Sequence, residues 1–134
     1  MIVVDVNILA YCWIPGPRTA EARRVLHKDP HWRLPMLWRS EMLNILAGYL
    51  RREQLNFDQA LLAIRTLERR YRDNEYRPRS ETVLKRARSS GCSAYDCEYA
   101  ALAYELNIPL ITEDQALLQA FPDIALDMNA FAAS

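Results

Sequence analysis

Apolar residues recur with helical spacing along most of the chain, and short apolar runs separate the helical stretches. The clearest unit runs from Ser93 to Asp114 and reads as a helix, a turn, a buried strand and the start of another helix. Its helix places apolar residues on one face, at offsets of four, seven, eight and eleven: Tyr95, Tyr99, Leu102, Ala103 and Leu106. Ser93 suits the N-cap of this helix, and Thr112 suits the cap of the next one.

A second helix with this spacing begins at Trp38. Glu41 lies within its apolar stripe, and a carboxylate on a core-facing stripe is costly unless it is paired or bound to a cation. A long amphipathic helix follows over Phe57–Tyr71. The short connection between the two predicts an antiparallel helical hairpin at about residues 38–72.

The remaining segments alternate between short strands and helices. Ile2–Val4 is β-branched and continuously apolar, as in a strand covered on both faces. Ser80 is the expected N-cap of a helix, Gly91 is expected to close that helix, and the tail from Asn129 is expected to pack lightly. Further strands are expected at residues 33–35, 75–77, 110–111 and 124–126, and further helices at 19–28, 81–90 and 115–121.

Strands that alternate with helices indicate a parallel sheet with helices on both faces. A chain of 134 residues is long enough for one domain with a core of its own. We therefore expect a single domain over residues 1–134, with a three-layer α/β/α fold around a central parallel sheet of four to five strands.

Composition adds one asymmetry to this picture. The formal net charge is zero, yet all 17 Lys and Arg residues lie between Arg18 and Arg88, while residues 91–134 hold seven acidic residues. A metal site beside a polyanion-binding surface would produce this division. A protein with an ordinary charge dipole and no such sites would produce it too. The three cysteines form no C-x-x-C pair, so no disulfide framework or zinc knuckle is indicated. The chain shows no signal peptide and no run of membrane-spanning length, which predicts a cytoplasmic protein without a membrane partner.

Four acidic residues are the candidates for chemistry. Asp5 and Asp114 each follow an apolar strand, and such strand ends form the ligand-binding edge of an open α/β sheet. Asp96 begins a helix and Glu41 interrupts a helical stripe, so all four can meet at that edge. Clustered carboxylates repel one another, and hard divalent ions such as Mg²⁺ or Mn²⁺ relieve that repulsion. Such ions activate water for phosphodiester hydrolysis.

Each candidate also has a structural interpretation. Asp96 and Asp114 lie in helix first turns that acids favour, Asp5 suits the cap of the turn that leads into the first helix, and an ion pair with Arg39 or an edge position would satisfy Glu41. Asn7 is an ordinary turn residue in that interpretation. A basic stripe along the helix at 57–71 is either a solvated face or a contact surface for RNA phosphates: Arg65, Arg69 and Arg72.

The order of these motifs resembles the PIN-domain ribonucleases. The matching motifs are D-x-N at Asp5, a helical Glu41, S-A-Y-D ending at Asp96, and L-I-T-E-D ending at Asp114. The chain length and the A-Y-D-C-E-Y-A-A-L-A stretch are most similar to VapC-type toxins. The resemblance implies that these four acids hold Mg²⁺ or Mn²⁺ and that two polar residues support the site, Asn7 and Thr112. It also implies an RNA endonuclease that is commonly a homodimer and is held inactive by a cognate antitoxin.

Other classes fit the sequence less well. A catalytically silent PIN-fold module that binds RNA or protein is the main alternative, and the complete set of four acids argues against it. A receiver-like phosphoacceptor needs a lysine at a late strand end, where residues 91–134 have none. An aspartyl phosphatase needs a second acid where Asn7 stands. The sequence therefore favours a metal-dependent endoribonuclease.

Overall fold

A five-stranded parallel sheet forms the centre of the structure, a computed structural model that describes residues 1–134. The strand order is β3-β2-β1-β4-β5, and every neighbouring pair is parallel. This arrangement confirms the predicted α/β fold with a central parallel sheet. The strands are β1 (Ile2–Val4), β2 (Trp32–Pro35), β3 (Glu75–Tyr76), β4 (Leu110–Ile111) and β5 (Ala125–Leu126).

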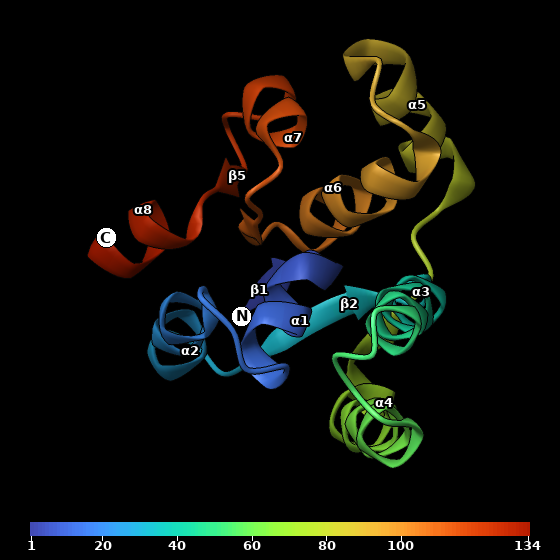
Figure 1. Cartoon of the computed structure of the whole chain (residues 1–134). Helices are drawn as coiled ribbons and strands as arrows, with labels where there is room; N and C mark the ends of the chain where they lie inside the picture. Colours follow the sequence, from blue (N-terminus) through green and yellow to red (C-terminus); the bar gives the residue numbers. More distant parts are fainter.

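Helices cover both faces of this sheet (Figure 1). On one side lie α5 (Ser80–Ser90) and α6 (Ala94–Leu106), and on the other lie α2 (Thr19–Lys28) and α4 (Phe57–Tyr71). Helix α6 packs across β1, β2 and β4. Because α6 spans the middle of the sheet, its first turn reaches the carboxyl ends of the central strands.

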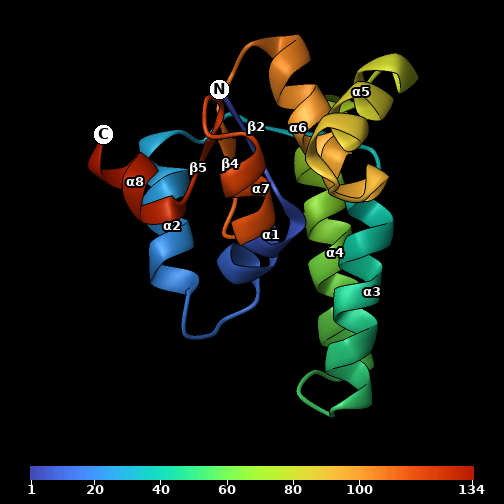
Figure 2. The same ribbon diagram turned by 90° about the horizontal axis from the view of Figure 1, so that it is seen from above.

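The other helices extend these layers. Helix α1 (Val6–Trp13) continues directly from β1 and packs against α2 and α3 (Trp38–Arg51). Helix α7 (Gln115–Ala120) contacts β5, and α8 (Met128–Ala133) packs against α2 near the carboxyl terminus (Figure 2). A single 3₁₀ turn, Arg72–Asn74, joins α4 to β3. None of the helices is long and apolar enough to cross a membrane.

Helices α3 and α4 lie side by side as an antiparallel pair that projects from the sheet (Figure 2). Asn56 begins α4 with a capping box, because its side chain accepts from the Gln59 N–H and the Gln59 side chain accepts from the Asn56 N–H. An aromatic cluster anchors the pair to β2 and α1, with ring centroids 5.7–6.3 Å apart. Its members are Trp13, Trp32, Trp38 and Tyr71. This anchor fixes the first turn of α3, which carries Glu41.

Four predicted helix ends can be compared with the structure. Ser93 accepts from the Asp96 N–H as the N-cap of α6, and Gly91 ends α5 in the left-handed conformation at φ 72°, so both predictions are confirmed. The prediction for Thr112 was wrong, because Asp114 caps α7 through the Leu117 N–H. Ser80 was also wrong as a cap, since it is the first residue of α5 and Arg79 precedes it without a side-chain hydrogen bond.

Some predicted packing also differs. Tyr95 was expected to face inward, but it is 65% exposed because no other element covers it in the first turn of α6. The tail was expected to pack lightly, yet it forms α8 and buries Met128 and Phe131. Tyr99, by contrast, is buried as expected.

Candidate active site

Asp5 and Thr112 meet at the carboxyl ends of the two central strands. The sheet grows in opposite directions from β1 and β4, so the gap between them is a topological switch point where open α/β folds bind ligands. The Thr112 hydroxyl donates to Asp5 Oδ2, and Asp5 Oδ1 accepts from the N–H groups of Asn7 at 2.9 Å and Ile8 at 3.2 Å. Asp5 is therefore the N-cap of α1 as well as a member of the predicted site.

Burial gives the Asp5 carboxyl an unusual affinity for protons. Only 7% of the residue is exposed, and this loss of solvation raises its pKa from 3.8 to about 6. The hydrogen bonds from Thr112, Ile8 and Asn7 lower the pKa, whereas the nearby charge of Asp114 raises it further. A buried carboxyl beside a second acid is stabilised in its charged form by a bound cation.

Glu41 lies in the first turn of α3, and its side chain forms a hydrogen bond with a residue of α6. Its Oε1 accepts a hydrogen bond of 2.6 Å from the Tyr99 hydroxyl on α6. Burial raises the Glu41 pKa, the Tyr99 hydrogen bond lowers it, and the charges of Asp96, Asp5 and Glu98 raise it. Glu41 is therefore within electrostatic reach of two other predicted site residues, Asp5 and Asp96.

The ion pair with Arg39 that would satisfy Glu41 structurally does not form. Arg39 instead binds Glu75 at 2.6 Å and Glu68 at 2.8 Å. The Glu41 carboxylate thus has a hydroxyl partner but no cationic one. An acid without a counter-charge on a partly buried helix face favours the metal-binding interpretation.

Tyr99 is the site residue that sequence reasoning missed. Its helical spacing predicted a core residue, and it is indeed buried, but its hydroxyl points at Glu41. A buried tyrosine needs a partner for its hydroxyl, which is the one signal that pointed to a polar neighbour.

A cavity of about 500 Å³ opens beside Glu41 and Asp96, between the first turns of α1, α3 and α6. Asn7 lines it with an exposed side chain, as the candidate supporting role requires. Asp5 is buried next to Val6 in the chain and does not line the cavity. The full lining is Val6, Asn7, Leu37, Ser40, Glu41, Asn44, Ile45, Ser93, Tyr95 and Asp96.

Asp114 does not line this cavity. Its charge acts on Asp5, but its Oδ1 accepts from the Leu117 N–H at 3.0 Å and its own N–H donates to Thr112. No group of three or more acidic, histidine or cysteine side chains is arranged to hold a metal ion in the structure. The structure therefore places the four acids where their charges act on one another, but it does not arrange them as a complete set of metal ligands.

The donor chemistry fits Mg²⁺ or Mn²⁺. All four candidate ligands are carboxylates, and two of them, Asp5 and Glu41, have raised pKa values because of burial and neighbouring negative charge. Hard divalent ions prefer such oxygen ligands.

Two further acids near the strand ends have different surroundings. Glu113 forms an ion pair with Arg18 and accepts from the Met128 N–H at 3.3 Å, so it ties the β4 end to α2 and α8. Glu98 has a pKa raised by burial, and its charge acts on Glu41. Glu98 is thus part of the acidic neighbourhood, and Glu113 is a structural residue.

Two residues of the predicted basic stripe lie on the outer side of α4, and the third begins the 3₁₀ turn that follows it. The side chains of the stripe are exposed and form no ion pair within the chain: Arg65, Arg69 and Arg72. Because these arginines are exposed and form no ion pair, a polyanion can reach them. Their contact with RNA stays a prediction.

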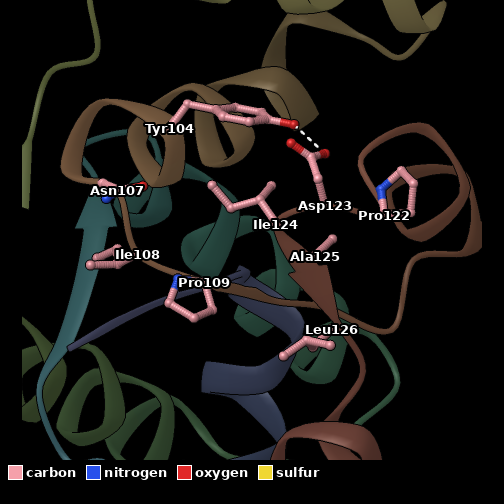
Figure 3. Close-up of a pocket in the computed structure, with 9 residues that line it drawn as sticks. All are labelled: Tyr104, Asn107, Ile108, Pro109, Pro122, Asp123, Ile124, Ala125 and Leu126. Carbon is pink, nitrogen blue, oxygen red and sulfur yellow. Dashed lines mark hydrogen bonds between the residues drawn. The ribbon is translucent and has the colours of Figure 1, made fainter.

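A different cavity of about 420 Å³ lies at the opposite edge of the sheet, where β4 and β5 begin (Figure 3). The Tyr104 hydroxyl donates to Asp123 at 2.7 Å across it, and Asp123 is the only acid in its lining. Amino ends of strands are not the ligand-binding edge of this fold class, and the acids of the candidate site are absent here.

The parallel sheet and the acids at its switch point define an α/β protein with a candidate metal-dependent site. Residues 2–122 match the PIN domain family. Ribonuclease VapC3 of Pyrobaculum aerophilum is 29% identical over 125 residues, which cover 90% of this chain and 95% of that protein. The chain belongs to the PIN domain family and is related to the VapC toxins of toxin–antitoxin systems, which confirms the resemblance seen in the sequence.

Solved structures agree with this assignment of the fold. The crystal structure of PAE2754 from Pyrobaculum aerophilum has a TM-score of 0.77 at 20% identity, covering 98% of this chain and 93% of that one. A toxin–antitoxin complex from Klebsiella pneumoniae has a TM-score of 0.61 at 18% identity, covering 96% and 98%.

Proposed function

We propose that the protein is a metal-dependent endoribonuclease and the toxin of a toxin–antitoxin pair. The observation that carries the proposal is the placement of acids at the switch point of the sheet, where the charges of Asp5 and Asp96 act on Glu41 and that of Asp114 acts on Asp5. The relationship to a ribonuclease of similar length supports RNA as the substrate.

The residues that would hold Mg²⁺ or Mn²⁺ are Asp5, Glu41, Asp96 and Asp114. The bound ion would lower the pKa of a water molecule and neutralise charge on the phosphodiester. Two contacts of this chain orient the ligands in advance: Thr112 holds Asp5, and Tyr99 holds Glu41. Such outer hydrogen bonds fix the direction of a metal ligand and strengthen binding.

The partner we infer is a cognate antitoxin, because a structure of the same fold is a toxin–antitoxin complex. A homodimer and a cytoplasmic location, where the RNA substrate is found, belong to the same proposal.

The proposal is tested by metal dependence. Purified protein is expected to cut single-stranded RNA internally with Mg²⁺ or Mn²⁺, and excess EDTA should stop the reaction because no side chain replaces the activated water. Cleavage is followed with an end-labelled RNA on a denaturing gel. Full-rate cleavage in EDTA would contradict the metal mechanism. RNA binding without cleavage under either metal would instead favour the silent binding module.

Tyr99→Phe is expected to raise the Mg²⁺ concentration needed for half-maximal cleavage by about 10-fold or more. The substitution removes the donor that orients Glu41 and lowers its pKa, so protons compete more strongly with the metal. The loss should grow as the pH falls. The measurement is a Mg²⁺ titration of the initial rate at several pH values.

Tyr104→Phe is the matched control, since its hydroxyl donates to Asp123 at 2.7 Å outside the site. An equal change in both variants would show that the Tyr99 hydroxyl has only a structural role.

A further inference from the structure

Part of the lining of the cavity beside the acids is apolar. The apolar members are Val6, Leu37, Ile45 and Tyr95, and the proposed metal chemistry has no use for them. The cavity volume of about 500 Å³ is within the range of about 300–1,000 Å³ that small organic ligands occupy. The apolar lining therefore suits a part of the substrate other than the phosphate.

Tyr95 is the one aromatic residue in this lining. It lies in the first turn of α6, directly before Asp96, and is 65% exposed. Its ring packs against no other aromatic ring or cation, and its hydroxyl makes no hydrogen bond within the chain. An aromatic face left free in a cavity is a platform on which another flat apolar group can stack.

Asn44 supplies a polar group on the facing helix. It lies on α3, one turn after Glu41, and its exposed amide lines the same cavity. An amide offers two donor hydrogens and one acceptor oxygen. This combination can pair with the edge of a nucleobase, as amide side chains do in nucleic-acid recognition.

We propose that this cavity binds one unpaired base of the RNA, stacked on Tyr95 and hydrogen-bonded at its edge by Asn44. The adjoining phosphodiester then lies at Glu41 and Asp96, which line the same cavity. The inference rests on the proposed ribonuclease function and adds to it a site for one unpaired base. A base within a duplex remains stacked on its neighbours and cannot enter such a cavity.

The test compares binding of dye-labelled oligoriboadenylate by fluorescence anisotropy, in protein that also carries Asp5→Asn to suppress cleavage. Tyr95→Ala should weaken binding about 10-fold, the usual effect of losing one base-stacking side chain. Tyr95→Phe retains the ring and should stay within about twofold of the parent. The matched control is Phe57→Ala, because Phe57 is 67% exposed on α4 and outside the cavity. It should leave binding unchanged.

A second readout uses the active protein and reports on Asn44. Cut sites mapped on a mixed-sequence RNA should show a base preference beside the cleaved bond, and Asn44→Ala should weaken that preference while cleavage continues. A duplex of the same RNA should be bound and cut poorly by every variant.

The outcomes separate the two proposals. Unchanged binding in Tyr95→Ala, or equal loss in Phe57→Ala, overturns the base site while cleavage by the wild type still supports the nuclease. Conversely, Tyr95-dependent binding in a protein that never cleaves supports the base site and overturns the nuclease.

Discussion

Asp5→Asn is expected to abolish RNA cleavage while the protein stays folded. The substitution removes one negative charge from the metal ligands and keeps the shape of the side chain. Its remaining carbonyl oxygen can still accept from the N–H groups of Asn7 and Ile8, so the start of α1 is preserved. Loss of several kcal/mol of metal-dependent stabilisation corresponds to roughly a thousandfold slower reaction. Initial rates on single-stranded RNA, with circular dichroism of the same samples, measure both parts.

Asp127→Asn is the matched control for this prediction. Asp127 also follows a strand and caps a helix, because its side chain accepts from the Ala130 N–H at 2.7 Å. Its charge is not among those that shift the pKa of Asp5 or Glu41. Its substitution should leave cleavage near the wild-type rate. Similar rates in both variants would show that Asp5 acts only as a cap.

The capping and metal interpretations of these acids turn out to be compatible. Asp5 caps a helix, as the structural interpretation predicted, Asp114 caps the next helix instead of lying in its first turn, and both lie at the switch point. A pattern of residues along the chain shows that an acid follows a strand. It does not show the strand order that makes β1 and β4 neighbours, because that order depends on long-range packing.

Glu41 was the strongest signal in the sequence for a physical reason. Its position on an apolar stripe required a partner, and the structure supplies Tyr99, which lies 58 residues away in the chain. Helical spacing identifies Tyr99 as an inward residue but contains no information on which helix its hydroxyl meets. The pair could therefore be found only once the packing of α3 and α6 was known.

Two helices were not predicted. One has no polar face, and the other is too short to show a helical period. Helix α1 buries residues on most of its surface, so no amphipathic period separates it from the strand before it. Helix α8 has only six residues, and its packing against α2 determines its burial.

In EDTA at pH 7, Asp5→Asn is expected to melt at a higher temperature than the wild type. The folded-state pKa of Asp5 is about 6 against 3.8 for the ordinary carboxyl, and the residue is almost fully buried. A pKa raised by folding gives stability that is complete below the unfolded value and is lost as the pH rises through the folded value. The wild type therefore loses about 2 kcal/mol between pH 4 and pH 7 through this group, on the order of 10 °C in melting temperature.

An asparagine at this position does not titrate, so the advantage of Asp5→Asn should shrink to nothing near pH 4. Asp114→Asn and Asp96→Asn should also raise the melting temperature, by less, because each removes a charge that acts on Asp5 or Glu41 rather than the buried charge itself. Adding Mg²⁺ should reverse the order at pH 7, since a ligand that binds only the folded state stabilises the wild type and not the variant.

Thermal melts of wild type, Asp5→Asn and the Asp127→Asn control, in EDTA and in Mg²⁺ from pH 4 to pH 7, test this expectation. The control should show no gain at any pH, because Asp127 raises the pKa of neither Asp5 nor Glu41. If Asp5→Asn melts below the wild type at pH 7 in EDTA, the hydrogen bonds of the Asp5 carboxylate outweigh its burial and repulsion. The acids would then be independent helix caps, and a shared metal site would lose its physical basis.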